Sequence, residues 1–160
     1  MKEKDGEHPY GDVGQLILLA LFLIVWIVDS FFLRTSTFLS DHIPLYIRLV
    51  FLGLALATAA YLSMSGHDAV GREQRGTEVV SGGAFRYVRH PLYSACLLFY
   101  LGLSVSTASI FSLAFFVVIF VFYNYIASYE ERWLDEKFGE EYRRYRKRTG
   151  KWVPRISKGS

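Results

Sequence analysis

Hydrophobic residues are concentrated in four long runs, at 14–33, 43–64, 91–107 and 109–128, and polar residues fill the segments between and after them. About 20 consecutive apolar residues suffice to cross a bilayer as a helix, and the third run is near the lower limit. The pattern predicts an all-α integral membrane protein. We expect a bundle of four transmembrane helices, followed by a cytoplasmic C-terminal amphipathic helix in the tail 129–160, within one domain covering residues 1–160.

The last two runs are separated only by a short turn, which predicts an antiparallel helical hairpin. The two long polar segments, 65–90 and 129–160, then lie on the same side of the membrane. The first of these is rich in glycine and is read equally well as a plain connector or as a lid over a ligand. A protein with one elaborated face is expected to act on that face.

Charge assigns this face to the cytoplasm. If the chain begins inside, 16 of its 18 Lys and Arg residues fall on the inner side, leaving Arg34 outside and Arg48 within the second run. Cytoplasmic segments carry such an excess of positive charge. We therefore expect a multi-pass protein of the inner (cytoplasmic) membrane with both termini in the cytoplasm. The basic tail is expected to contact anionic membrane lipids rather than nucleic acid.

The motif "RHPLY" at the start of the third run suggests a binding site. Proline is favoured in the first turn of a helix, so a helix is expected to begin at Pro91, with His90 just outside it. The free N–H groups of a helix start attract anions, and Arg89, His90 and Tyr93 add polar groups there. The alternative is an interfacial anchor of Arg and Tyr side chains.

The helical hairpin predicts that Glu130 and Glu131 lie beside Arg89 and His90, at the inner ends of their helices. An anion site next to a carboxylate suits a zwitterion such as an amino acid headgroup, although a plain salt bridge between Arg89 and Glu131 is the alternative. At 100° per residue, Glu131 shares a stripe with aromatic residues of the tail, and Glu130 points about 100° away. That stripe assumes one continuous helix and comprises Leu134, Phe138, Tyr142 and Tyr145.

The fragments "RHPLY", "EE", "FGEEYRRY" and "WVPR" occur in this order within residues 79–155. Together they resemble the integral-membrane isoprenylcysteine carboxyl methyltransferase family, which is related to phospholipid N-methyltransferases. Because of its size, the chain is similar to short prokaryotic members. The resemblance implies S-adenosylmethionine as cofactor and a cover for the pocket from Trp152. The cofactor-binding residues that it implies are Arg89, His90, Pro91, Tyr93, Glu130, Glu131, Tyr142 and Tyr145.

The same resemblance implies catalytic roles for Arg89, which would orient an acceptor carboxylate, and for Glu131, which would accept a proton from an amine or thiol. The expected reaction is O-methylation of a lipophilic acceptor resembling an isoprenylcysteine carboxylate, entering from the bilayer. Phospholipid N-methylation and S-methylation of a small thiol are alternatives. An alternative of another class is a non-enzymatic membrane module that binds lipids or a partner.

Other polar residues in the apolar runs have simpler interpretations. Asp29 and Arg48 are expected to lie near the outer ends of their helices, Asp29 at the interface and Arg48 either snorkelling to the interface or pairing with Asp29. Asn124 is expected either to line the pocket or to form a hydrogen bond between helices. Cys96 is interpreted as a small packing residue. No metal site is expected, because His67 has no companion at ligand spacing.

Overall fold

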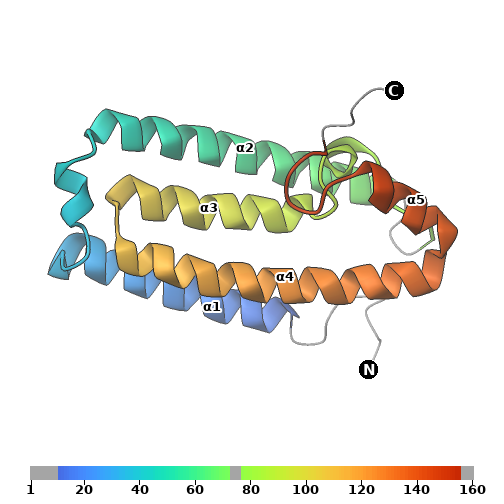
Figure 1. The fold of residues 1–160 in the computed structure, drawn as a ribbon, viewed down its shortest axis with the longest axis horizontal. Helices are drawn as coiled ribbons and strands as arrows, with labels where there is room; N and C mark the ends of the chain where they lie inside the picture. The colour runs from blue at the N-terminus through green and yellow to red at the C-terminus, as the bar shows by residue number, and fades with distance from the viewer. Residues whose placement is uncertain (1–10, 73–76, 156–160) are drawn as a thin grey trace.

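The computed structural model describes residues 11–72 and 77–155 and is built from helices (Figure 1). The first helix, α1 (Gly11–Ile27), continues into the π-helical turn η1 (Val28–Leu33), and a short 3-10 turn, η2 (Phe38–Asp41), leads to α2 (Leu45–Arg72). A second 3-10 turn, η3 (Gly83–Arg86), precedes the remaining helices. These are α3 (Pro91–Thr107), α4 (Ile110–Phe138) and α5 (Glu140–Arg148).

Three helical segments are long and apolar enough to cross a membrane, namely 11–33, 45–72 and 110–138. The expected third span forms α3 with the predicted bounds, but at 17 residues it is a shorter apolar helix than the other three. The fourth expected span, 109–128, lies within a longer helix, because α4 continues for ten residues into the charged segment. At 1.5 Å per residue, α4 is about 44 Å long and exceeds the roughly 30 Å core of a bilayer.

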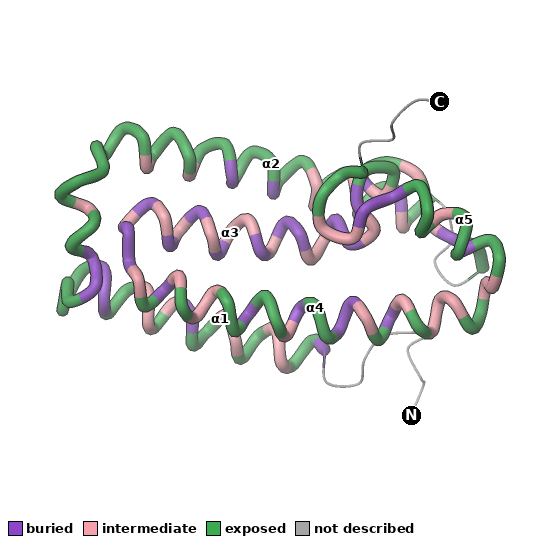
Figure 2. Tube along the Cα trace, in the orientation of Figure 1, coloured by how far each residue is buried: buried purple, intermediate pink, exposed green. Residues whose placement is uncertain are grey.

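Helix α3 lies at the centre of the bundle, and Figure 2 shows it more buried than α1 or α2. Small residues allow α2 to approach it closely. A Cβ atom at Gly102 would lie 3.2 Å from the Cβ atom of Ala55, and Ala59 is also buried on α2. Small side chains at helix contacts are typical of membrane bundles. On its other side, α3 contributes Leu97 and Tyr100 to a core shared with Phe22, Ile119 and Tyr123.

The end of the bundle opposite α5 is fastened by Asp29, which is buried. Its carboxylate accepts hydrogen bonds from the Thr35 hydroxyl at 2.9 Å, the Ser109 hydroxyl at 2.6 Å and the hydroxyl of Ser36. Arg48 instead donates to the backbone carbonyl of Ser106 at 2.9 Å. The alternative in which Arg48 pairs with Asp29 is therefore wrong, because nearby hydroxyl groups satisfy the carboxylate.

The α3–α4 hairpin is confirmed. Ala108 takes a left-handed conformation with φ 54°, and the Ser109 hydroxyl accepts a hydrogen bond from the N–H of Ser112 at the start of α4. Because the turn is so short, the 17 residues of α3 run back along a matching length of α4. This geometry places His90 and Arg89 opposite the part of α4 that follows residue 126.

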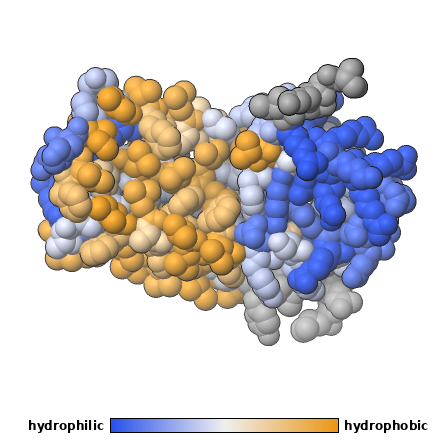
Figure 3. Space-filling view, viewed as in Figure 1, coloured by the Kyte–Doolittle hydropathy of each residue, from blue (hydrophilic) through white to orange (hydrophobic). Residues whose placement is uncertain are grey.

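Figure 3 shows a broad apolar band with a polar end on either side of it, and the larger of the two polar ends contains α5. The start of α1 lies at the same end as α5 (Figure 1). The expected gathering of polar segments on one face is thus confirmed for the described residues. The charges assigned to Lys2, Lys4, Arg75 and Lys158 lie outside them.

Candidate active site

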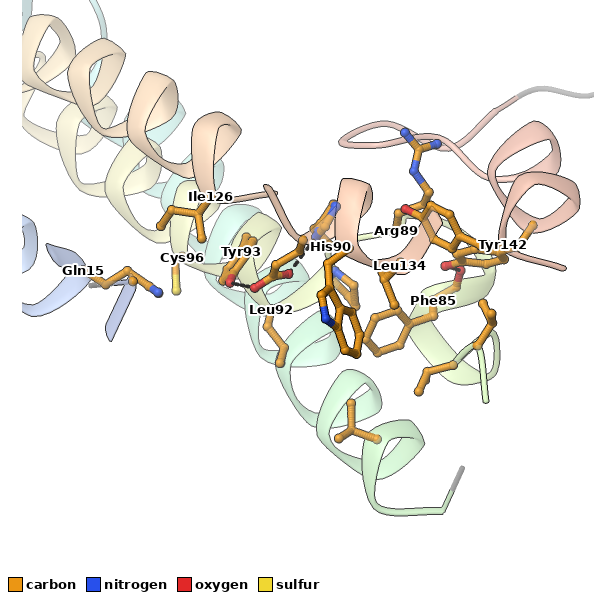
Figure 4. A pocket seen from close by; sticks show the side chains of 18 of the residues that line it. Gln15, Phe85, Arg89, His90, Leu92, Tyr93, Cys96, Ile126, Leu134 and Tyr142 are labelled. Carbon is orange, nitrogen blue, oxygen red and sulfur yellow. Dashed lines mark hydrogen bonds and ion pairs between the residues drawn. The ribbon is translucent and has the colours of Figure 1, made fainter. Parts of the chain in front are cut away.

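A cavity of about 280 Å³ lies where the apolar bundle meets the polar end. Every long helix contributes to its wall, together with α5 and the segment before α3. In Figure 4, Gln15 and Cys96 lie at one end of the cavity, and Phe85 and Tyr142 at the other. The predicted site residues that line it are Arg89, His90, Pro91, Tyr93, Glu130, Tyr142 and Tyr145.

The start of α3 has the conformation that the motif predicts. Pro91 is the first helical residue, and His90 precedes it with φ −126° and ψ 65°, outside the helical region. The His90 carbonyl accepts the N–H of Ser94 at 2.9 Å, which closes the first helical turn. His90 itself is buried, and its ring stacks on that of Tyr93 with centroids 5.7 Å apart.

The two glutamates meet this motif from α4. Glu131 Oε1 accepts a hydrogen bond from Arg89 Nε at 2.9 Å and lies 3.1 Å from His90 Nε2. Glu130 accepts a hydrogen bond from the Tyr93 hydroxyl, and its Oε2 lies 3.7 Å from His90 Nδ1. The structure thus brings Arg89, His90, Tyr93, Glu130 and Glu131 together, as the hairpin predicts.

The glutamate that lines the cavity is Glu130, whereas Glu131 is turned toward Arg89. The expectation that Glu131 faces the pocket and Glu130 points away from it is therefore wrong. Gly139, with φ 52° and ψ −121°, ends α4, so Tyr142 and Tyr145 belong to a separate helix and do not extend a stripe from Glu131. The cavity face of α4 instead consists of Ile126, Glu130, Trp133 and Leu134.

Arg89 joins the start of α3 to the chain that follows α5. Its Nη1 donates to the backbone carbonyl of Thr149 and lies 3.4 Å from that of Arg146, and its backbone N–H donates to the Gly150 carbonyl at 2.9 Å. Val88 and Gly150 also form an isolated parallel bridge. In Figure 4 the guanidinium points away from Phe85 and Leu134. Its hydrogen bonds to Glu131 and Thr149 therefore hold the cavity wall in place from behind.

Tyr142 lines the cavity and carries an unsatisfied polar group. It is 1% exposed, and its hydroxyl has no hydrogen-bond partner among the described residues. Burial, reinforced by the charge of Glu131, raises the pKa of Tyr142 above its usual value, so the hydroxyl is protonated at neutral pH. Buried polar atoms are rarely left unpaired, so this hydroxyl is a candidate for a hydrogen bond with a ligand. Tyr145 instead donates its hydroxyl to the Phe85 carbonyl at 2.7 Å.

Trp152, which was expected to cover the pocket, and Asn124, for which a pocket position was one of two alternatives, lie elsewhere. Trp152 lines an apolar groove between α2, α3 and α4, and its Nε1 donates to Asn124 Oδ1 at 3.3 Å. Asn124 also accepts a hydrogen bond from Lys151 Nζ at 2.9 Å. Both predictions of a pocket position are wrong, because these residues fasten the C-terminal segment to the outside of α4. Trp152 reaches the site only through His90, at 5.8 Å between ring centroids.

Sequence reasoning missed several cavity residues. Glu78 and Phe85 belong to the glycine-rich segment, whose possible role as a lid was the only signal for them. In this segment Gly83 has φ 52°, and a Cβ atom there would lie 2.7 Å from the Ser65 carbonyl oxygen, so glycine is required. Cys96 lines the cavity and is not only a packing residue. The described residues contain no cluster of His, Cys, Asp and Glu that could hold a metal ion.

Comparison with known proteins shows that the chain is similar to methyltransferases. Residues 44–141 match the family described as phospholipid methyltransferase. The chain is 32% identical to protein-S-isoprenylcysteine O-methyltransferase B of Arabidopsis thaliana over 54% of its own length and 44% of that protein. It is 29% identical to methanethiol S-methyltransferase 1 of Bradyrhizobium diazoefficiens over 75% of its length and 36% of that protein.

A third relative is the cobalt-zinc-cadmium resistance protein CzcN of Cupriavidus metallidurans. It is 34% identical over 71% of this chain and 51% of that protein. The chain therefore spans about half, or less, of the length of these curated relatives.

Proposed function

Because the chain belongs to the phospholipid methyltransferase family, we propose that it transfers a methyl group from S-adenosylmethionine to a lipophilic or membrane-associated acceptor. The observation that carries this proposal is the cavity where the apolar bundle meets the polar end, with the unpaired Tyr142 hydroxyl in its wall. A polar cofactor would enter such a cavity from the cytoplasm. An acceptor with an apolar tail would approach from the bilayer.

The residues of the cavity fit this cofactor. When bound, S-adenosylmethionine supplies an electrophilic methyl group on a positively charged sulfonium. Three carboxylates, those of Asp12, Glu78 and Glu130, line the cavity, and Arg89 is the lining arginine, with its Nε and Nη1 already used within the protein. The wall therefore favours a cationic ligand. The Tyr142 hydroxyl offers a hydrogen bond, and the volume is close to the lower end of the roughly 300–1,000 Å³ typical of small-molecule sites.

We assign different roles to the two glutamates. Glu130 contacts the cavity and is held by the Tyr93 hydroxyl, so it is positioned to meet the cofactor or to accept a proton from the acceptor at a carboxylate oxygen. Glu131 and Arg89 are positioning residues, which hold His90 and the segment after α5. This assignment revises the roles expected from the sequence, in which Glu131 was the base and Arg89 bound a carboxylate.

The acceptor chemistry decides how much is required of Glu130. A carboxylate acceptor, like that in the reaction expected from the sequence, is already a nucleophile and needs only alignment with the methyl group and exclusion of water. An amine or thiol must lose a proton, which Glu130 would accept. The relatives include proteins named as O- and as S-methyltransferases, so product analysis is the direct way to choose among the acceptor classes.

The orientation proposed for the membrane places the cavity at the cytoplasmic face, with both ends of the chain in the cytoplasm. Support comes from the distribution of Lys and Arg and from the shared location of the start of α1 and of α5. A multi-pass arrangement in the inner membrane is part of this proposal.

Calorimetry with S-adenosylhomocysteine tests cofactor binding by the full chain in detergent. We expect binding with a Kd in the micromolar range typical of enzyme substrates, weakened in Glu130→Gln. Glu136→Gln is the matched control, because Glu136 is exposed on the same helix and lies outside the cavity lining. Absence of binding by folded protein would overturn the proposal and favour a non-enzymatic lipid- or partner-binding module.

A labelled-methyl transfer assay identifies the acceptor class. Extracted membrane lipids, prenylcysteine analogues and small thiols serve as separate acceptors, and the position of the label distinguishes O-, N- and S-methylation. Transfer to none of the three, by protein that binds S-adenosylhomocysteine, would contradict the assignment of a lipophilic or membrane-associated acceptor.

A further inference from the structure

A second concave surface, of about 540 Å³, lies beside the cavity at the polar end of the molecule. It shares Val79 and Tyr145 with the cavity wall, so the two spaces are adjacent. Arg86, Arg144 and Arg148 line this surface, which we call the arginine groove.

The fold assembles the arginine groove from two segments that are distant in the sequence. Arg86 is the last residue of η3, whereas Arg144 and Arg148 lie one turn apart on α5 and therefore share a face. The two segments are held together by the hydrogen bond from the Tyr145 hydroxyl to the Phe85 carbonyl. Tertiary structure thus brings Arg86 to a groove whose other two arginines come from the basic run of α5.

The groove arginines have little compensating charge. Among the described residues, none of the three arginines forms an ion pair. The one polar contact of their side chains there joins Arg144 Nε to the Glu140 carbonyl oxygen at 3.4 Å. Glu141 is the acidic residue of the groove lining, so positive charge is in excess. A groove with an excess of positive charge attracts an anionic ligand.

Three other basic side chains of the C-terminal segment are engaged within the protein. Arg143 pairs with Asp135 and Glu140 at 3.0 Å each, and Lys151 donates to Asn124. Arg155 Nη1 donates to the Lys147 carbonyl at 2.6 Å. This contrast separates the arginine groove from the diffuse basic tail expected from the sequence.

The neighbourhood of the groove indicates which anion it holds. Tyr87, next to Arg86 in the sequence, and Trp152, shortly after Thr149, line the apolar groove between α2, α3 and α4. The apolar band of the surface begins beside the polar end, as Figure 3 shows. An amphiphile with an anionic headgroup would therefore find positive charge and apolar surface close together.

We propose that the arginine groove binds the phosphate group of a membrane lipid, at the edge of the candidate active site. Guanidinium groups match phosphate oxygens in paired, charge-assisted hydrogen bonds, and three arginines line this groove. The lipid chains would extend along the apolar band. This binding does not require methyl transfer, so its failure is separable from failure of the proposed function.

The test is calorimetric binding of dihexanoyl phosphatidic acid to the full chain in neutral detergent, without cofactor. The triple variant Arg86→Gln, Arg144→Gln, Arg148→Gln should bind at least about tenfold more weakly, and added salt should weaken binding by the original protein. A matched triple variant, Arg132→Gln, Arg146→Gln, Lys147→Gln, removes the same charge from exposed positions outside the groove and should bind normally.

Retention of S-adenosylhomocysteine binding, or of the unfolding temperature, shows that the groove variant is folded. Equal weakening in the two triple variants would overturn the proposal, because a general basic surface would then account for the affinity. Inorganic phosphate is the second probe. Binding of inorganic phosphate as tightly as phosphatidic acid would overturn the assignment to a lipid, whereas much weaker binding supports it.

Discussion

Arg89 and Glu131 lie 42 residues apart in the sequence, yet Arg89 Nε donates to Glu131 Oε1 at 2.9 Å, with side chains only 11% and 13% exposed. Because Arg89 also donates to the Thr149 carbonyl, the same guanidinium joins α3, α4 and the segment after α5. The cavity wall depends on all three. The pair is therefore a structural junction of the candidate active site.

Removing one member of this pair should weaken the whole junction. In Glu131→Gln, Arg89 keeps its position but loses its compensating charge, and we expect a loss of about 3 kcal/mol in the free energy of unfolding. The measurement is thermal unfolding in detergent, combined with limited trypsin digestion. Cleavage in α5 and the following segment should become faster.

Arg143→Gln is the control for that prediction. Arg143 pairs with Asp135 and Glu140 at an exposed position, where an ion pair contributes little. Its unfolding temperature should stay close to that of the original protein. If the two variants unfolded alike, the junction would have no special role.

Tyr142→Phe should have opposite effects on stability and on ligand binding. Without a ligand, loss of an unpaired buried hydroxyl should leave the free energy of unfolding unchanged or raise it by up to about 1 kcal/mol, and the unfolding temperature should follow. With S-adenosylhomocysteine, the Kd should rise about tenfold, because the ligand loses a hydrogen bond. Calorimetry and thermal unfolding on the same sample give both values.

Tyr46→Phe removes a hydroxyl from a residue that is 69% exposed, near the start of α2 and far along the bundle from the cavity. It should change neither quantity. An unaltered Kd in Tyr142→Phe would show that the hydroxyl does not contact the ligand.

Glu130→Gln should affect amine or thiol acceptors more than a carboxylate acceptor. Glutamine retains an oxygen that accepts the Tyr93 hydroxyl but cannot take up a proton, so kcat for a proton-bearing acceptor should fall about 100-fold. For a carboxylate acceptor, the change should appear mainly as weaker cofactor binding. Rates of labelled-methyl transfer at saturating cofactor separate these cases, and a kcat unchanged for an amine or thiol would exclude Glu130 as the base.

Asp29→Asn should destabilise the opposite end of the bundle without altering the cavity. Its carboxylate accepts hydrogen bonds from Thr35, Ser36 and Ser109, and an amide group cannot accept them all. We expect a loss of about 2 kcal/mol in stability and an unchanged Kd for S-adenosylhomocysteine. Asp41→Asn, at an exposed position near the same end, is the control. A changed Kd in Asp29→Asn would contradict the separation of the two ends.

The meeting of Arg89 and His90 with the two glutamates was predictable from sequence, because it requires only helix lengths and a short turn. Apolar runs set those lengths, and Pro91 marks the helix start. The choice between Glu130 and Glu131 was not predictable in this way. The stripe that favoured Glu131 assumes one continuous helix, and the break at Gly139 removes Tyr142 and Tyr145 from it.

The position of Trp152 was likewise beyond sequence reasoning. Trp152 follows α5 at a distance that suits a pocket cover, but its indole N–H is satisfied by Asn124 on the outside of α4. Hydrogen bonds of this kind, between segments without a repeating pattern, leave no periodic signal. The same holds for Glu78, whose place in the cavity wall depends on the path of an irregular segment.

The contribution of α5 to the cavity has a consequence for biosynthesis. Tyr142 and Tyr145 are translated after every membrane-spanning helix, and the Arg89 tether needs Thr149, which comes later still. The bundle is therefore able to insert into the bilayer before the pocket exists. We expect nascent chains that end before α5 to be membrane-integrated yet unable to retain the cofactor, so that activity begins only when synthesis of this segment is complete.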